Sequence, residues 1–116
     1  MKRFVPVARL SDVPPGEARV FEAEGVSLAL CNVGGEIYAL DNLCTHDDGP
    51  LGSGTLHGAA IECPRHGARF DVKTGAVLRM PAAFPVRTYP TRVEGGQILV
   101  AVDSPPEGAN ESGEAS

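Results

Sequence analysis

The segments Cys44-Thr45-His46 and Cys63-Pro64-Arg65-His66 hold two of the three cysteines and two of the three histidines of the chain. Each segment supplies one thiolate and one imidazole, separated by one residue in the first segment and by two in the second. Glycine and proline surround both segments, so the backbone can turn tightly at each of them. These four side chains predict a metal centre if the fold brings the two loops face to face.

The ligand types leave two kinds of metal centre open. Two cysteines and two histidines can hold a tetrahedral zinc ion. They can equally hold a [2Fe–2S] cluster in which two histidines replace two cysteines on one iron. Structural zinc sites usually place like ligands close together, whereas each segment here mixes one cysteine with one histidine. The spacing therefore favours the cluster over zinc. A disulfide between Cys44 and Cys63 is the least favoured alternative, because it would leave the two histidines without a role.

The composition predicts an all-β chain. Its 116 residues suit one small domain, and 42% hydrophobic residues suffice for one core. The 14 glycines and 10 prolines predict many turns and short strands, and no segment has a convincing helical pattern. The predicted strands cover residues 4–8, 19–23, 26–33, 36–40, 68–72, 76–78, 86–93 and 97–102.

Paired turn residues predict how these strands are connected. Glu24-Gly25, Gly34-Gly35 and Gly95-Gly96 each join two predicted strands as a hairpin. We therefore expect an antiparallel sandwich or barrel, with a small metal-binding subdomain inserted at about residues 42–79. Residues 1–103 form this single domain, and residues 104–116 are expected to be a disordered acidic tail because they hold nothing to bury.

The charge and the apolar pattern exclude several classes of protein. The net charge of −5 argues against binding to nucleic acid. No apolar run reaches the roughly 20 residues that a membrane-spanning helix needs. The residues after Met1 lack the apolar region of a secretory signal. We therefore expect a cytoplasmic protein whose cysteines bind metal and do not form disulfides.

Both motifs and their flanks resemble the Rieske iron–sulfur family. Within it, the chain is most similar to the small Rieske ferredoxins of bacterial aromatic-ring dioxygenase systems, over Phe4 to Val102. The matching pieces are Cys44-Thr45-His46, Cys63-Pro64-Arg65-His66-Gly67, Phe70-Asp71 and Thr74-Gly75.

This resemblance implies one Rieske-type [2Fe–2S] cluster and a role for each ligand. Cys44 and Cys63 would bind the inner iron, and His46 and His66 the outer iron, which lies nearer to solvent. The family fold places the cluster at the tip of the small subdomain. The segment Met80-Pro81-Ala82-Ala83-Phe84-Pro85 is similar to the proline-containing loop that covers the cluster from a third side.

Departures from other Rieske proteins predict a low reduction potential. Those of respiratory and photosynthetic complexes carry a disulfide-linked cysteine in each ligand loop, where this chain has Asp47 or Asp48 and Arg65. They also place a serine hydroxyl just after the second motif, where this chain has Ala68. Losing a hydrogen bond to a cluster sulfur lowers the potential. We expect a value near the low end of the Rieske range of roughly −150 to +300 mV.

The expected function is one-electron transfer, not catalysis. The chain would carry electrons from an NAD(P)H-dependent flavin reductase to a terminal ring-hydroxylating oxygenase, docking transiently near His46 and His66. The alternatives are a small subunit or accessory protein of another redox enzyme, of nitrite-reductase or iron–sulfur-assembly type, and a zinc-binding interaction module. An oxygenase is excluded because its mononuclear iron needs two further histidines and a carboxylate, and only His57 remains.

His57 is expected in a solvated loop, and Cys31 as a small buried apolar residue.

Overall fold

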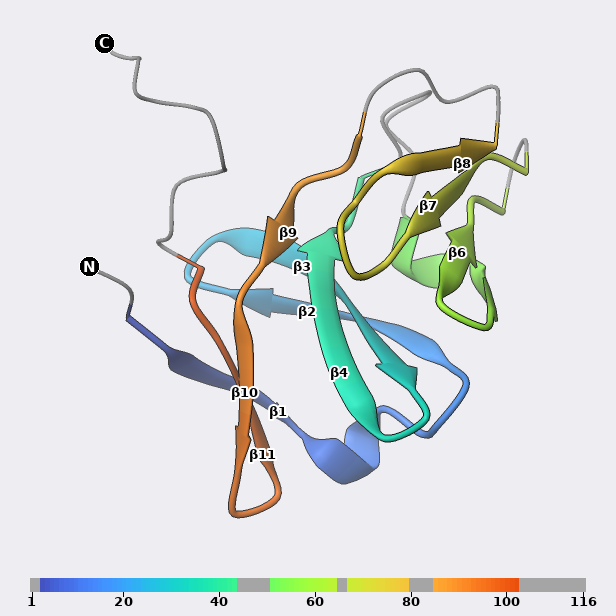
Figure 1. The fold of residues 1–116 in the computed structure, drawn as a ribbon. Helices are drawn as coiled ribbons and strands as arrows, with labels where there is room; N and C mark the ends of the chain where they lie inside the picture. The colour runs from blue at the N-terminus through green and yellow to red at the C-terminus, as the bar shows by residue number, and fades with distance from the viewer. Residues whose placement is uncertain (1–2, 44–50, 65–66, 80–84, 103–116) are drawn as a thin grey trace, which may run out of the picture.

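The computed structural model describes residues 3–43, 51–64, 67–79 and 85–102 (Figure 1). Within these ranges the chain forms β-strands and two 3₁₀ turns, and it contains no α-helix. The 3₁₀ turns are η1 (Leu10–Asp12) and η2 (Leu51–Ser53). The strands are β1 (Val5–Arg9), β2 (Ala18–Ala23), β3 (Val26–Val33), β4 (Glu36–Asp41), β5 (Thr55–His57), β6 (Ala60–Glu62), β7 (Arg69–Asp71), β8 (Val77–Arg79), β9 (Thr88–Tyr89), β10 (Thr91–Glu94) and β11 (Gln97–Val100).

These strands form three antiparallel sheets, which confirms the all-β fold class. One sheet has the order β1-β11-β10, the second β2-β3-β4-β9, and the third β5-β6-β7-β8. The glycine-containing turns join β2 to β3, β3 to β4 and β10 to β11, as the sequence predicts. Gly34 and Gly35 have φ angles of 61° and 98°, which a two-residue hairpin turn requires and which glycine adopts without strain. No helix in the described residues is long and apolar enough to span a membrane.

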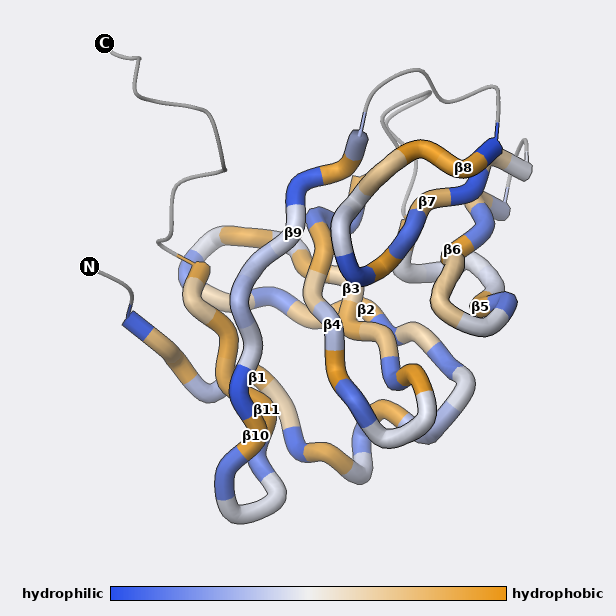
Figure 2. Tube along the Cα trace, viewed as in Figure 1, coloured by the Kyte–Doolittle hydropathy of each residue, from blue (hydrophilic) through white to orange (hydrophobic). Residues whose placement is uncertain are grey.

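The β2-β3-β4-β9 sheet lies between the other two sheets and is covered on both faces. Along β3, Leu28 and Leu30 belong to a core cluster that also contains Ile98 and Val100 of β11. Cys31 belongs to a second core cluster, which contains Ile61 of β6 and Phe70 of β7. Because neighbouring side chains point to opposite faces, a strand buried on both sides is nearly continuously apolar. Figure 2 shows this apolar character along the central strands.

Cys31 confirms its predicted role as a buried apolar residue. Its side chain is 0% exposed. Burial disfavours the thiolate and raises the pKa of Cys31 to about 12. This thiol is therefore protonated and inert at neutral pH, unlike a cysteine that binds metal.

The predicted strand over residues 86–93 is wrong as a single element, because Pro90 divides it. Residues Thr88–Tyr89 pair with β4, whereas Thr91–Glu94 pair with β11 in a different sheet. Proline has no backbone N–H to donate to a ladder, so it sits where the chain leaves one sheet for another. Its carbonyl still accepts a hydrogen bond of 3.0 Å from the Ala101 N–H.

His57 is exposed to solvent as expected, but the predicted loop is wrong, because His57 ends strand β5. Thr55–His57 pairs with Ala60–Glu62, and the turn contains Gly58 with a φ angle of 62°. In the two strands of this hairpin only Leu56 and Ile61 are large apolar residues, which leaves no alternation to identify in the sequence. This hairpin forms one edge of the sheet that carries the Cys63 segment.

Candidate metal centre

Cys63 lies at the tip of the β6–β7 hairpin. Its N–H donates a hydrogen bond of 2.7 Å to the Ala68 carbonyl, and its carbonyl accepts one of 3.1 Å from the Gly67 N–H. Gly67 has a φ angle of 77°, a conformation that residues with a Cβ rarely adopt. The Cys63 side chain is 1% exposed and forms no disulfide. The loop that begins at Cys63 is therefore closed at its base, with its thiol shielded from water.

Asn42 connects the two chain segments that flank residues 44–50. Its side-chain oxygen accepts a hydrogen bond of 2.6 Å from the Gly52 N–H. Its side-chain nitrogen lies 3.1 Å from the Ser27 hydroxyl, and its backbone N–H donates to the Ser27 carbonyl at 3.0 Å. Asn42 thus links β3 to the turn η2 across the interval of residues 44–50.

Two glycines allow η2 to pack closely against its surroundings. A Cβ atom at Gly52 would lie 2.6 Å from Cγ2 of Val20, closer than real Cβ atoms approach other atoms. A Cβ atom at Gly54 would overlap the carbonyl oxygen of Glu62, the residue before Cys63. Glycine at residue 54 therefore lets the segment that follows the first motif lie directly against the strand that leads into the second.

Val86, close to the end of the segment 80–85, is held by the β7–β8 turn. The Val86 N–H donates a hydrogen bond of 2.9 Å to the Gly75 carbonyl, and the Gly75 N–H donates one of 2.6 Å to Asp71. Gly75 has a φ angle of 80°, and a Cβ atom there would overlap the Val86 carbonyl. The β7–β8 turn thus holds the chain that returns after residues 80–84.

One core cluster underlies all three of these segments. Leu51 follows the first motif, Cys63 begins the second, and Val86 follows the proline-containing segment. All three side chains are buried in the cluster that also contains Ala68 and Phe70. Apolar burial therefore brings together chain segments that are far apart in the sequence.

Glu62 carries a charged network beside Cys63. Its Oε1 lies 2.9 Å from His57 Nε2 and 3.0 Å from the Arg69 guanidinium. The hydrogen bond from Arg69 is the main reason that the pKa of Glu62 lies below its ordinary value. Glu62 is therefore ionised at neutral pH and offsets positive charge on this face of the sheet.

The structure describes one of the four predicted ligands. Cys44, His46 and His66 lie outside the described residues, as do Asp47, Asp48, Arg65 and the segment 80–84. No group of three or more potential metal ligands occurs among the residues that are described. Sequence reasoning missed Asn42, Gly52, Gly54 and Glu62. Their position in the sequence could have identified them as part of the site, because they lie beside or between the two motifs.

The Rieske [2Fe-2S] domain model matches residues 3–90 of this chain. The chain belongs to the Rieske [2Fe–2S] domain family. Its cofactor is one Rieske-type cluster, so the family match decides between cluster and zinc. The donor set fits, because the sequence holds two cysteines and two histidines in the paired motifs and the described Cys63 has a free, buried thiol.

Curated Rieske relatives are similar to this chain over most of its length. The ferredoxin component of the naphthalene 1,2-dioxygenase system of Pseudomonas aeruginosa is 41% identical over 99 residues, which cover 85% of this chain and 95% of the relative. The ferredoxin subunit of the 3-phenylpropionate/cinnamic acid dioxygenase of Escherichia coli (strain K12) is 46% identical over 92 residues. These cover 78% of this chain and 86% of the relative.

Solved structures of Rieske ferredoxins share the fold. The ferredoxin of carbazole 1,9a-dioxygenase from Nocardioides aromaticivorans IC177 aligns with a TM-score of 0.81 at 41% identity, covering 84% of this chain and 96% of that one. A chain from the complex of reduced oxygenase and oxidized ferredoxin in carbazole 1,9a-dioxygenase aligns with a TM-score of 0.80 at 36% identity. The alignment covers 87% of this chain and 94% of that one. A nitrite reductase small subunit is 20% identical with a TM-score of 0.73, which shows a shared fold alone.

Proposed function

We propose that this protein is a one-electron carrier that passes electrons from an NAD(P)H-dependent flavin reductase to a terminal ring-hydroxylating oxygenase. The observation that carries the proposal is its similarity to dioxygenase ferredoxins, which for the Pseudomonas aeruginosa relative covers 85% of this chain and 95% of the relative. The complex in the carbazole system supports an oxygenase as the receiving partner. A reductase is proposed because a carrier needs an electron source. In this proposal the chain carries electrons and catalyses no reaction itself.

We assign the cluster ligands to Cys44, His46, Cys63 and His66. The bound cluster supplies one-electron chemistry, gaining and losing a single electron. The chain supplies a buried thiol at Cys63 and a loop base closed by two backbone hydrogen bonds. Because these hydrogen bonds already fix the loop, the protein rearranges little around a metal centre when the charge of that centre changes. Partner docking near His46 and His66 belongs to the same proposal.

The domain limits follow from this assignment. We propose one Rieske domain over residues 1–103, a cluster-binding subdomain at about 42–79, and a tail over 104–116. The β5-β6-β7-β8 sheet spans Thr55–Arg79 and supports this subdomain. Residues 103–116 lie outside the described ranges. A cytoplasmic location is also proposed, because the described Cys31 and Cys63 are free thiols.

The environment of Cys63 supports a low reduction potential. Ala68 is fully buried in the same core cluster as Cys63, and its carbonyl accepts the Cys63 N–H. A methyl group at this place offers no hydroxyl to hydrogen-bond with a cluster sulfur. A low-potential carrier suits transfer from a flavin to an oxygenase.

Electron paramagnetic resonance on the purified protein tests the proposal. We expect no signal from the oxidised form and a rhombic signal with a low average g-value after dithionite reduction. Reduction by NADH together with the reductase component of a naphthalene 1,2-dioxygenase system then tests electron entry. Absence of the signal, with zinc found by metal analysis, would overturn the electron-carrier function.

A further inference from the structure

The β7–β8 hairpin places two arginines opposite each other. Arg69 is the first residue of β7 and pairs with Arg79, the last residue of β8. Like charges directly opposite each other on neighbouring strands destabilise a sheet. Glu62 offsets Arg69 through its ion pair, but Arg79 is exposed and has no acidic partner among the residues that the structure describes.

A β-bulge creates this pairing. Phe70 pairs with Val77, so a regular antiparallel ladder would place Leu78 opposite Arg69. The register instead shifts between Arg69 and Phe70, and Arg79 takes that place. Leu78 becomes the extra residue of the bulge and is 55% exposed. One local irregularity thus produces both a positive charge that has no acidic partner among the described residues and an exposed apolar side chain.

This arrangement lies at the end of the hairpin nearest the proposed ligands. Arg69 follows Ala68, whose carbonyl closes the loop that begins at Cys63. The opposite end of the hairpin is the Lys73–Gly75 turn. Strand β8 is also the edge of its sheet, so its outer side is not covered by another strand of the described chain.

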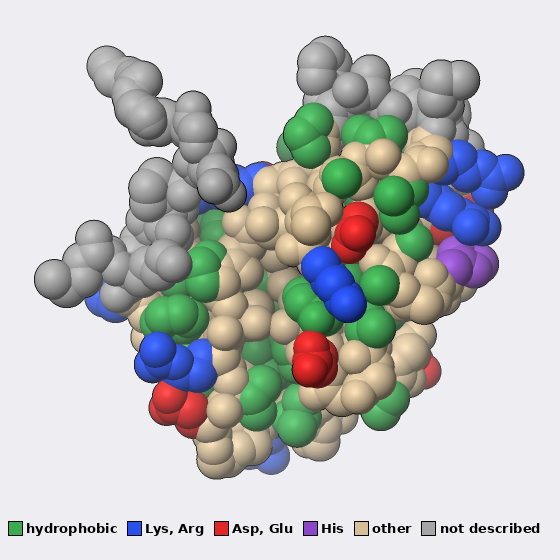
Figure 3. Space-filling view, in the orientation of Figure 1, with side chains coloured by type: hydrophobic (Ala, Val, Ile, Leu, Met, Phe, Trp, Pro, Cys, Tyr) green, Lys and Arg blue, Asp and Glu red, His purple; other side chains and the backbone are tan. Residues whose placement is uncertain are grey.

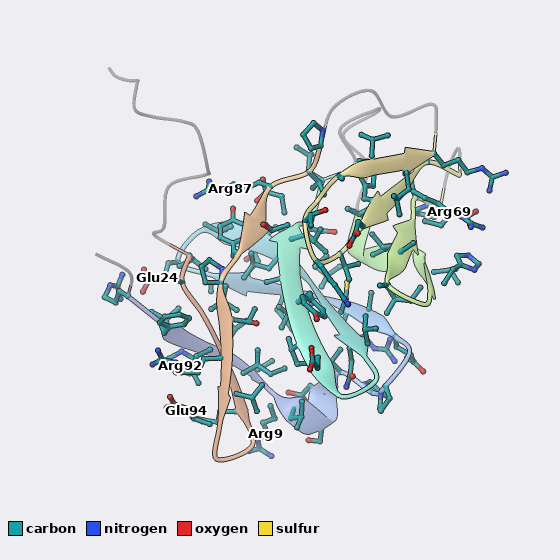
Figure 4. The ribbon with its side chains drawn as sticks, viewed as in Figure 1. Arg9, Glu24, Arg69, Arg87, Arg92 and Glu94 are labelled. Carbon is teal, nitrogen blue, oxygen red and sulfur yellow. The ribbon has the colours of Figure 1, made fainter. Side chains whose placement is uncertain are left out.

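The positive charge here contrasts with the acidic residues 3–43, while residues 85–102, with two basic residues and one acidic residue, also carry a formal charge of +1. Residues 51–64 and 67–79 hold three basic and two acidic residues, a formal charge of +1, whereas residues 3–43 hold three basic and six acidic residues, a charge of −3. Figure 3 shows basic side chains gathered beside a histidine at one edge of the molecule. Figure 4 places Arg69 at this edge and Arg92 on the far side.

We infer that the β8 edge, formed by Arg69, Leu78 and Arg79, docks an acidic surface of the oxygenase that receives electrons from this carrier, the kind of partner seen in the carbazole 1,9a-dioxygenase complex. Carboxylates of the partner would compensate Arg79, and the contact would cover Leu78. The contrast in charge would also orient the acidic molecule, so that its basic edge leads during the encounter. This inference rests on the proposed function, because it assigns the partner chemistry of the same site.

The test measures the electrostatic field where electrons leave the protein. The reduced protein is oxidised in stopped flow by anionic hexacyanoferrate(III) and, separately, by cationic tris(phenanthroline)cobalt(III). Ionic strength is raised from about 0.01 M to about 1 M, which shortens the Debye length from about 30 Å to about 3 Å. A net charge of −5 by itself predicts that salt accelerates the anionic oxidant. A local positive edge predicts that salt slows it.

Arg79→Gln is the test variant and Arg92→Gln is its matched control. Arg92 lies on β10, 4.3 Å from the Phe4 ring, and its substitution changes the net charge equally. We expect Arg79→Gln to slow the anionic oxidant about threefold or more at low salt, and Arg92→Gln to change it little. Thermal stability of Arg79→Gln should be unchanged or higher, because a like-charge pair is removed.

The outcomes separate the two proposals. If the protein shows no iron–sulfur signal, the proposed function fails before this test begins. If a reducible cluster is present but the two variants behave alike, or salt accelerates the anionic oxidant in the wild type, the docking inference is overturned. A loss of stability in Arg79→Gln without a kinetic change would assign Arg79 to protection of the sheet edge instead.

Discussion

The side-chain oxygen of Asn42 accepts a hydrogen bond of 2.6 Å from the backbone N–H of Gly52. The chain between these residues contains Cys44 and His46. Because the side-chain nitrogen of Asn42 contacts Ser27 on β3, one side chain joins the described residues before and after positions 44–50 to the central sheet. The described residues on either side of positions 44–50 are therefore fixed to each other and to β3.

Asn42→Ala removes this link, so we expect faster loss of the cluster. The unpaired Gly52 N–H and the lost contact to Ser27 should together cost about 1–3 kcal/mol. The rate of bleaching of the visible absorption in the presence of a chelator measures the effect. Ser27→Ala is the control, because it removes the hydroxyl contact and leaves the Gly52 hydrogen bond intact. Equal bleaching rates in both variants would show that the Asn42–Gly52 bond does not stabilise the loop.

Gly54→Ala should destabilise the protein more than Gly58→Ala. A methyl group at residue 54 would overlap the Glu62 carbonyl, so β6 or η2 must shift. At Gly58 nothing lies within 4 Å, and only the φ angle of 62° opposes a side chain, at about 1 kcal/mol. Chemical denaturation followed by circular dichroism compares the two variants. A smaller loss at residue 54 than at residue 58 would contradict the close approach.

Cys63→Ser should abolish the cluster or change its spectrum, because a hydroxyl is a poor substitute for a thiolate ligand. Cys31→Ala is the matched control, since Cys31 is also buried in the same core cluster but is not assigned as a ligand. We expect its iron content to equal that of the wild type. Unchanged absorption and iron content in Cys63→Ser would refute the ligand assignment.

Ala68→Ser should raise the reduction potential, because a hydroxyl near a cluster sulfur stabilises the reduced form. Protein-film voltammetry measures the shift. The site is fully buried, so the variant should also be checked by circular dichroism for an intact fold. A potential that falls or stays constant in a folded variant would show that Ala68 does not set the low value.

Removal of residues 104–116 should leave the fold and the cluster spectrum intact, because the described core clusters are built from residues before 103. Thermal unfolding and visible absorption of the shortened chain measure this. A large fall in thermal stability would show that the tail contributes to the domain.

Two strand assignments could not be predicted from the alternation of apolar and polar residues in the sequence. Residues 86–93 alternate well, yet the chain changes sheets at Pro90, because β9 pairs with β4 and β10 pairs with β11. His57 belongs to a strand of three residues that is defined by its pairing with β6. The change of sheet depends on pairing with strands that are distant in the sequence, and the β5–β6 hairpin holds only two large apolar residues, Leu56 and Ile61, which leave no periodic signal.

Residue identity and local spacing were enough to predict the all-β class and the hairpins with paired glycines, and to propose the four ligands, because turn chemistry and metal chemistry depend on them. Which segments support one another depends on packing in three dimensions. The Asn42–Gly52 bond, the contact between Gly54 and Glu62, and the pairing of Arg69 with Arg79 all join residues through three-dimensional packing. Burial of Leu51, Cys63 and Val86 in one core stabilises that arrangement, and such burial is a property of the whole fold.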